Sequence, residues 1–314
     1  SQVPVADVLS VYLDEVVPKQ ARPAKVASRI GRLLDWWGTK SLSDVSPGTC
    51  RDYTAKGKRG GSRRDLEDLR AAINHHAKRG LHKGYVEVEL PAKGHARAEW
   101  LTRDEVARLV WACWRHGRAV RLPRGRSSGA VIESGWHDLR HIARFILLGV
   151  YTGSRSGTIF TASIFAGPNR SFLDLDNGIF YRLAEGATAT NKRQPPAPIP
   201  PRLLAHLRRW RDKGVIAQHA VEWQGLPVQS IKVGWKRAVE LSGIEKKIVP
   251  HTLRHTAATW LMQQGVGLWE ASGYLGMSEQ VLKDTYGHHH PDFLRNAAIR
   301  IGQNRNAKRT HSLP

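Results

Sequence analysis

The segment DTYGHHHPDF, residues 284–293, places one tyrosine beside three consecutive histidines. A tyrosine hydroxyl can act as a covalent nucleophile, and imidazoles are common metal ligands. Three successive histidines cannot all face one ion from a helix or a strand, and the segment adds only Asp284 and Asp292 as carboxylates. We therefore interpret Tyr286 as the reactive group and expect no bound metal, with a metal site as the weaker alternative.

Two other stretches offer groups that bind anions. YTGSRSGTIF, residues 151–160, places Arg155 at the start of a predicted helix, where a guanidinium and free main-chain NH groups suit a phosphate oxygen. In PHTLRHTAATWLMQQG, residues 250–265, His251 and Arg254 are three positions apart and share one face of a helical turn. Both stretches predict an anion site.

The charge of the chain indicates what kind of partner it has. Its 314 residues include 49 lysines and arginines against 27 aspartates and glutamates, which gives a net charge of +22 at pH 7. A positive field attracts polyanions, and nucleic acid is the commonest partner of such a basic chain. The composition therefore favours a nucleic-acid-binding protein over a lipid-surface or ribosome-associated one.

Other features argue against several classes of protein. Cys50 and Cys113 are the only cysteines, too few for a disulfide framework or a four-cysteine zinc site. The longest apolar run, at 143–151, is shorter than the ~20 residues that cross a membrane, and the first residues do not resemble a signal peptide. We expect a cytoplasmic, nucleoid-associated protein with no membrane partner.

Apolar periodicity and composition divide the chain into parts. Residues 1–90 repeat near the helical period and predict a helical domain, residues 91–98 predict a linker, and residues 99–314 predict a second domain with a C-terminal tail. The basic stretch KGKRGGSRR at 56–64 is expected to be a loop that contacts phosphates. Its candidate DNA-binding residues are Lys58, Arg59, Arg63 and Arg64.

The second domain is expected to be mainly helical with a small antiparallel sheet. Thr102 and Glu105 form a capping box at the start of a helix, and the arginine- and glycine-containing residues 115–135 predict a mobile loop. From residue 171 the apolar period changes to two, and DNG predicts a hairpin of the primed-turn kind, followed by an edge strand in PAPIP. Most tryptophans occupy core-like positions rather than base-stacking ones, including Trp36, Trp111, Trp210 and Trp260.

Taken in order, these elements resemble the tyrosine recombinase family, also called phage integrases. The second motif of that family, His-x-x-Arg-His, is present as HTLRH at 251–255, and Tyr286 follows Arg254 by 32 residues, the family's usual interval. TGSR at 152–155 resembles the first arginine motif. The resemblance covers most of the chain and implies a helical core-binding domain followed by a mixed α/β catalytic domain.

A second match to the short pattern, HDLRH at 137–141, lacks the rest of this arrangement. The residue 32 positions after Arg140 is Phe172, and the TG-x-R element follows this match rather than preceding it. We interpret His137 and His141 as the polar side of a helix.

The resemblance implies a role for each site residue. Arg155 and Arg254 would hold the non-bridging oxygens of a DNA phosphate, and Tyr286 would attack the phosphorus to form a 3′-phosphotyrosine. His251 would assist proton transfer at the nucleophile, and His255 would support the site by hydrogen bonding. Because the phosphotyrosine keeps the energy of the phosphodiester, no metal, ATP or other cofactor is expected.

The family also has a lysine in a turn of the small sheet, before an extended segment that ends in proline. NKRQPPAPIPPRLL offers Lys192 for that position, with Arg193 as the runner-up. In the family this lysine protonates the leaving 5′-oxygen.

One position departs from the family pattern. Where the family usually has histidine or tryptophan after a Leu-Gly pair, this chain has Met277, whose thioether cannot donate a hydrogen bond to a phosphate. Either the contact is absent, or His288, His289 or Trp269 supplies it. Loss of one such donor typically costs ~3 kcal/mol, which affects the rate more than the type of reaction.

The sequence therefore predicts a site-specific recombinase that integrates or excises a mobile element. The expected partners are a duplex DNA recombination site, other protomers of a homotetramer joined through the C-terminal segment, and possibly a directionality factor. Resolution of dimeric replicons, DNA inversion and a type IB topoisomerase remain close alternatives. A catalytically weak or inactive DNA-binding relative and a metal-dependent His/Tyr nuclease are alternatives from other classes.

Overall fold

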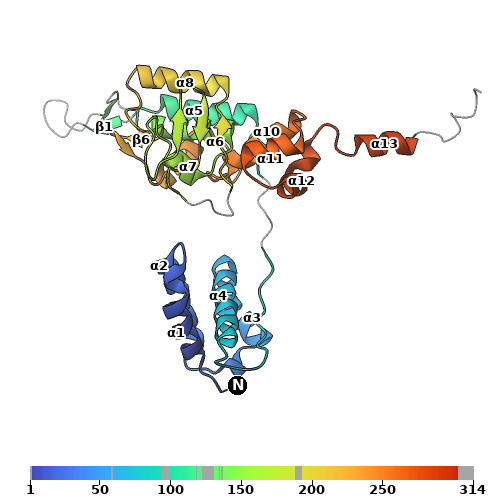
Figure 1. The fold of residues 1–314 in the computed structure, drawn as a ribbon. Coiled ribbons are helices and arrows are strands. Elements are labelled where there is room, and N and C mark those ends of the chain that lie inside the picture. Colours follow the sequence, from blue (N-terminus) through green and yellow to red (C-terminus); the bar gives the residue numbers. More distant parts are fainter. Residues whose placement is uncertain are drawn as a thin grey trace, which may run out of the picture. The chain divides into compact units, whose positions relative to one another are not determined.

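The computed structural model describes residues 2–57, 59–93, 99–117, 119–121, 131–133, 135, 137–187 and 193–302. Contacts divide the chain into two compact units, Ser1–Arg97 and Ala98–Pro314, which we call the N-terminal and C-terminal units. Both are mainly helical, and the described strands form small antiparallel sheets (Figure 1), so the predicted fold class is confirmed. Among the described helices, none is both long and apolar enough to cross a lipid bilayer.

In its described part, the N-terminal unit packs four α-helices around one apolar core. Leu9, Ile30, Leu33 and Leu66 are fully buried there, and they come from three different helices with the spacing that a helical period requires. The elements are α1 (Val5–Glu15), η1 (Val17–Lys19), α2 (Pro23–Trp37), η2 (Leu42–Asp44), α3 (Pro47–Lys56) and α4 (Arg59–Lys78).

The basic stretch at 56–64 is not a loop throughout, as the sequence had predicted, because α4 already begins at Arg59. Arg63 donates to the Glu67 carboxylate at 3.1 Å and Arg64 donates to it at 2.7 Å. Ion pairs three and four residues apart stabilise a helix, which explains why this basic segment is helical. Lys58 and the side chain of Arg59 lie outside the described residues.

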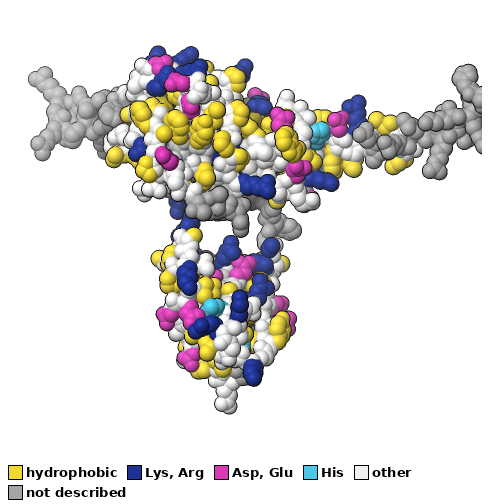
Figure 2. All heavy atoms as spheres, viewed as in Figure 1, with side chains coloured by type: hydrophobic (Ala, Val, Ile, Leu, Met, Phe, Trp, Pro, Cys, Tyr) yellow, Lys and Arg dark blue, Asp and Glu magenta, His cyan; other side chains and the backbone are white. Residues whose placement is uncertain are grey.

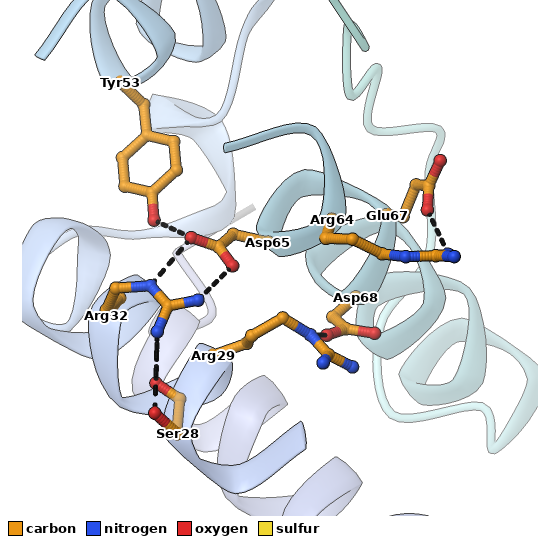
Figure 3. Close-up of polar contacts among 8 residues, drawn as sticks. All are labelled: Ser28, Arg29, Arg32, Tyr53, Arg64, Asp65, Glu67 and Asp68. Atoms are coloured by element: carbon orange, nitrogen blue, oxygen red, sulfur yellow. Dashed lines mark hydrogen bonds and ion pairs between the residues drawn. The ribbon is translucent and has the colours of Figure 1, made fainter. Parts of the chain in front are cut away.

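A polar network joins α2, α3 and α4 inside the N-terminal unit (Figure 3). The buried carboxylate of Asp65 accepts two hydrogen bonds from Arg32, at 3.0 and 2.6 Å, and one from the Tyr53 hydroxyl at 2.7 Å. Burial, followed by the bond to Asp65, raises the pKa of Tyr53. Beside this network Arg29 pairs with Asp68. The network therefore neutralises each buried charge with an opposite one.

The C-terminal unit packs its helices around a larger core that includes Ile142, Phe145, Phe180 and Leu207. The predicted capping box of Thr102 and Glu105 is present at the start of α5. The described helices are α5 (Arg103–Arg115), α6 (Arg140–Thr152), α7 (Ser156–Phe160), α8 (Pro201–Asp212), α9 (Lys232–Ser242), α10 (Thr252–Gln263), α11 (Leu268–Leu275), α12 (Glu279–Tyr286), η3 (Gly287–His289) and α13 (Arg295–Gly302).

The described strands of this unit form three small sheets. The central one has the order β3-β4-β5, and the predicted hairpin and edge strand are its members. The hairpin loop differs from the expected primed turn, because Asp174 pairs with Ile179 and four residues lie between them. The Asp174 carboxylate accepts from the main chain and side chain of Asn177, which stabilises the longer loop. The strands are β1 (Ala119–Arg121), β2 (Val131–Glu133), β3 (Phe172–Asp174), β4 (Ile179–Tyr181), β5 (Ala197–Pro198), β6 (Glu222–Trp223) and β7 (Leu226–Pro227).

Two further expectations are corrected. The stretch 115–135 contains the antiparallel pair β1–β2 rather than only a loop. Trp111 is 53% exposed and is not a core residue, whereas Trp210 and Trp260 are buried as predicted. Trp111 lies on the outer side of α5, because the apolar face of that helix is already formed by Val106, Leu109 and Cys113.

Candidate active site

The HTLRH motif forms the start of α10. His251 is the N-cap residue of this helix, while Arg254 and His255 lie in its first turn. The Arg254 side chain is buried, with 6% of its surface exposed. The motif thus presents two imidazoles and one guanidinium from a single helical turn, as its spacing predicted.

Arg254 connects two glycine turns. Its Nη1 donates to the carbonyl of Gly153 at 2.6 Å and its Nη2 donates to the carbonyl of Gly276 at 3.5 Å. Both glycines have positive φ, 60° and 63°, and a Cβ at Gly153 would lie 2.3 Å from the Leu275 side chain. Only glycine therefore fits at Gly153, where α6 ends and the TGSR turn begins.

Arg182, which the sequence analysis did not single out, joins the same two segments. Its Nη2 donates to the carbonyl of Thr152 at 2.7 Å and its Nη1 to the carbonyl of Tyr274 at 2.5 Å. The residue is 4% exposed, directly follows β4, and burial lowers its pKa to about 10. A buried cation held by main-chain oxygens leaves no sequence signature, because every residue has a carbonyl.

Arg155 lies beside these two arginines. It is the N-cap residue of α7, as predicted, and its Nη1 donates to the carbonyl of Arg193 at 2.9 Å. The Arg193 carbonyl that it binds lies against Gly276, whose own carbonyl accepts from Arg254, so the guanidiniums lie in one region. The charge of Arg155 helps to lower the pKa of both Arg182 and Arg254, after burial. The pKa of Arg254 falls to about 10, so all three arginines remain protonated at pH 7.

Tyr286 ends α12 and is buried, with 7% of its surface exposed. Its hydroxyl lies 2.5 Å from Nδ1 of His255. Burial raises the pKa of Tyr286, and burial, together with His251 and Arg254, lowers the pKa of His255 to about 4. At pH 7 the phenol therefore keeps its proton and the imidazole is neutral, and the tautomer of His255 decides which of the two groups donates the hydrogen bond.

His251 lies near this pair without bonding to the hydroxyl. Its ring centroid is 4.9 Å from that of His255, and the two rings are perpendicular. Burial of the ring lowers the pKa of His251, and the positive charges of Arg254 and Arg155 lower it further. His251 thus lies close to the positive charges of Arg155 and Arg254, while His255 is the histidine in contact with Tyr286.

The remaining predicted residues lie around this centre. Met277 packs in a small apolar cluster with α10, α11 and α12. His288 is exposed and lies against His289, whose ring contacts Trp100 edge-on. Lys192 lies outside the described residues. Among the described residues, no three His, Cys, Asp or Glu side chains form a group that could hold a metal ion.

Comparisons with known proteins show what this chain is similar to. Residues 169–292 match the phage integrase family. Tyrosine recombinase XerD of Listeria monocytogenes is 36% identical over 95 residues, which cover 26% of this chain and 31% of that protein. An integrase/recombinase of Escherichia coli is 40% identical over 60 residues, which cover 19% of this chain and 18% of that protein. These matches support the predicted resemblance to the tyrosine recombinase, or phage integrase, family. The aligned stretches span less than a third of the length of these relatives.

Solved structures resemble the chain over almost its whole length. The Tn1549 transposon integrase in complex with a circular intermediate DNA has a TM-score of 0.70 at 14% identity, covering 96% of this chain and 100% of that one. A lambda integrase tetramer bound to a Holliday junction has a TM-score of 0.64 at 17% identity, covering 92% of this chain and 79% of that one. At these identities the likeness shows a shared fold.

Proposed function

We propose that this protein is a site-specific DNA recombinase that cuts and rejoins duplex DNA through Tyr286. The observation that carries the proposal is the charge of the site. Arg155, Arg182 and Arg254 are neighbours, and each donates to main-chain carbonyls with no carboxylate partner in the described part of the chain. Their positive charge is therefore available to a phosphodiester beside a buried tyrosine.

In the proposed reaction, Arg155 and Arg254 bind the non-bridging oxygens of the scissile phosphate. These bonds strengthen as negative charge grows on the oxygens in the transition state. Arg182 holds the TGSR turn and the end of α11 in place and adds a third positive charge. The bonds that Arg182 and Arg254 make to residues 152–153 and 274–276 fix the positions of the two glycine turns relative to each other.

The tyrosine needs an acceptor for its proton. His255 occupies that position, because its Nδ1 lies 2.5 Å from the hydroxyl of Tyr286. A bound phosphate would bring negative charge to the site and oppose the effect of Arg254 on this imidazole, so His255 becomes more basic when DNA is present. Tyr286 then forms a 3′-phosphotyrosine, and Lys192 protonates the 5′-oxygen that leaves, with His251 assisting proton transfer.

The same proposal extends to the partner and the biological task. Duplex DNA is the substrate, contacted also by Lys58, Arg59, Arg63 and Arg64 of the N-terminal unit. Lysine and arginine side chains are spread over both units (Figure 2). Integration or excision of a mobile element and assembly as a tetramer on DNA are the forms of the reaction that the similar integrases suggest. The apolar side chains of Ile299 and Ile301, exposed on α13, are available for contacts between protomers.

The test is covalent trapping in the presence of a chelator. Native protein, Tyr286→Phe and Tyr85→Phe are mixed with sheared genomic DNA and denatured in detergent, and the protein-linked ends are sequenced. Tyr85, which is 89% exposed, supplies the matched control. Adducts at one recurrent site, present with native protein and Tyr85→Phe and absent with Tyr286→Phe, are the expected result.

Two other outcomes contradict the proposal. If cleavage occurs only when manganese or magnesium replaces the chelator, a metal-dependent nuclease is the correct function. If duplex DNA binds but no adduct forms under either condition, the protein is a binding-only relative.

A further inference from the structure

A groove of about 700 Å³ lies among α5, α6 and α8, away from the residues assigned above. We call it the α5–α8 groove. Trp260 of α10 also lines it, but neither the three arginines nor the histidines of the candidate site do so. The groove is therefore separate from the candidate active site, and the proposed reaction gives it no role.

Basic residues follow one edge of this groove. Arg202, His206, Arg209 and Lys213 lie at intervals of four, three and four residues along α8 and its C-cap, so they form one row on the helix surface. All four are exposed. In the described part of the chain, Arg202, Arg209 and Lys213 form no ion pair, whereas Arg211 on another side of α8 pairs with two aspartates.

The rest of the lining is apolar and aromatic. Trp111 is 53% exposed beside Val110 and the partly buried Trp114 of α5, and Trp210 of α8 stacks on Trp114. No aspartate or glutamate is among the described residues that line the groove. An exposed apolar surface beside a row of unpaired cations is typical of a binding site for an amphipathic, acidic segment.

The indole rings of this region are already in contact with cations. In three cases a guanidinium lies 3.5–5.1 Å from the ring centroid. A ring face covered in this way is not open to a stacked nucleobase, which argues against single-stranded nucleic acid as the occupant. The three pairs are Arg103 with Trp260, Arg115 with Trp111, and Arg140 with Trp114.

We propose that the α5–α8 groove binds an acidic amphipathic helix of a partner protein. Such a helix would place carboxylates at intervals of four, three and four residues opposite the row on α8. It would also place large apolar side chains against Trp111 and Val110. About 12 residues, or roughly 17 Å of helix, would span the row.

The C-terminal segment of a second copy has the wrong charge for this groove. Residues 291–314 contain five lysines and arginines and a single aspartate. A segment of this positive charge would approach a row of like charges, which is unfavourable. The groove is thus separate from any contact that α13 makes between protomers.

The experiment uses the full chain without DNA, so its result does not depend on the proposed function. A fluorescein-labelled helical peptide of about 16 residues carries glutamates at the 4-3-4 spacing beside leucines, and two matched peptides carry glutamine or lysine instead. Anisotropy titrations compare native protein with Arg202→Glu/Arg209→Glu and with Trp111→Ala. Lys236→Glu and Trp269→Ala are the controls, because both side chains are exposed on other helices.

The native protein is expected to bind the glutamate peptide about tenfold more tightly than the glutamine peptide. The doubly reversed variant should prefer the lysine peptide, Trp111→Ala should weaken binding of the glutamate peptide, and both controls should bind like native protein. Equal binding by native and reversed proteins would overturn the proposal. So would groove-dependent binding of a labelled 291–314 peptide or a single-stranded oligonucleotide with no binding of the glutamate peptide.

Discussion

The two units of this protein hold their arginines with opposite kinds of partner. In the N-terminal unit Arg29 pairs with Asp68, and Arg32 pairs with the buried Asp65. In the C-terminal unit the buried arginines donate to main-chain carbonyls instead. These arginines are Arg144, Arg182 and Arg254.

The kind of partner distinguishes arginines whose charge is neutralised within the fold from arginines whose charge is available to a ligand. A carboxylate neutralises the guanidinium that it binds, whereas a carbonyl orients it and leaves its charge in place. Burial lowers the pKa of the three C-terminal arginines to about 10, which still leaves them protonated. Two of them, Arg182 and Arg254, lie in the candidate site, so that site carries positive charge that no carboxylate of the described residues neutralises by an ion pair.

The largest expected effect is on catalysis. Arg254→Met removes the proposed donor to the scissile phosphate and should lower the rate of covalent adduct formation by ~10²–10³-fold. Arg208→Met is the matched control, because Arg208 also donates only to carbonyls, those of Leu175 and Asp176, but lies on α8. Adduct formation is measured in a time course on the trapped DNA site. Equal losses in the two variants would mean that the carbonyl-bound arginines act only on folding.

Arg182→Met should lower the same rate by about 10²-fold, through misplacement of the TGSR turn and the loss of one nearby charge. Arg182→Lys should recover part of the rate, because it restores the charge but not both carbonyl bonds. Duplex affinity, measured by anisotropy, should stay close to native in both variants. If Arg182→Met left the rate of adduct formation unchanged, Arg182 would have no role in the candidate active site.

The N-terminal unit should respond in stability rather than in chemistry. Asp65→Asn breaks the pairing with Arg32 and Tyr53 and should lower the free energy of unfolding by about 2 kcal/mol, since Arg32 is half-exposed and partly solvated. Asp35→Asn, on the exposed side of α2, is the control. Urea denaturation followed by tryptophan fluorescence measures both. If Asp65→Asn behaved like Asp35→Asn, the network in Figure 3 would contribute nothing to the fold.

A further effect on stability concerns pH. Burial lowers the pKa of His141 and of His255 to about 4 in the folded C-terminal unit. The unfolded chain, with histidine pKa near ~6.5, therefore takes up protons first as the pH falls. Stability is complete above about pH 6.5 and decreases towards pH 4, by up to about 1.4 kcal/mol per pH unit for each histidine.

His141→Phe should make this pH dependence less steep, whereas His206→Gln, at an exposed position, should leave it unchanged. Unfolding curves at several pH values between 4 and 7 provide the measurement. If the free energy of unfolding changed with pH in the same way for native protein and His141→Phe, His141 would not be responsible for the pH dependence.

Sequence reasoning predicted the parts of the site that are carried by side-chain spacing. The position of Arg155 at a helix start and the shared face of His251 and Arg254 depend on local spacing, which a sequence displays, whereas the interval between Arg254 and Tyr286 was interpreted through the resemblance to tyrosine recombinases. Arg182 could not be found in this way, because its partners are carbonyls 30 and 92 residues away. The exposure of Trp111 was also missed, since a tryptophan on a helix has the same apolar signature whether it faces the core or a groove.

The most direct test of the central claim measures how anions stabilise the C-terminal unit. Thermal unfolding of native protein and of Arg254→Met is followed in sulfate and in chloride at equal ionic strength. Sulfate stabilises proteins in general, so the difference between the two proteins is the quantity of interest. We predict a larger gain from sulfate for the native protein than for Arg254→Met. An equal gain would show that the buried guanidiniums do not form an anion site.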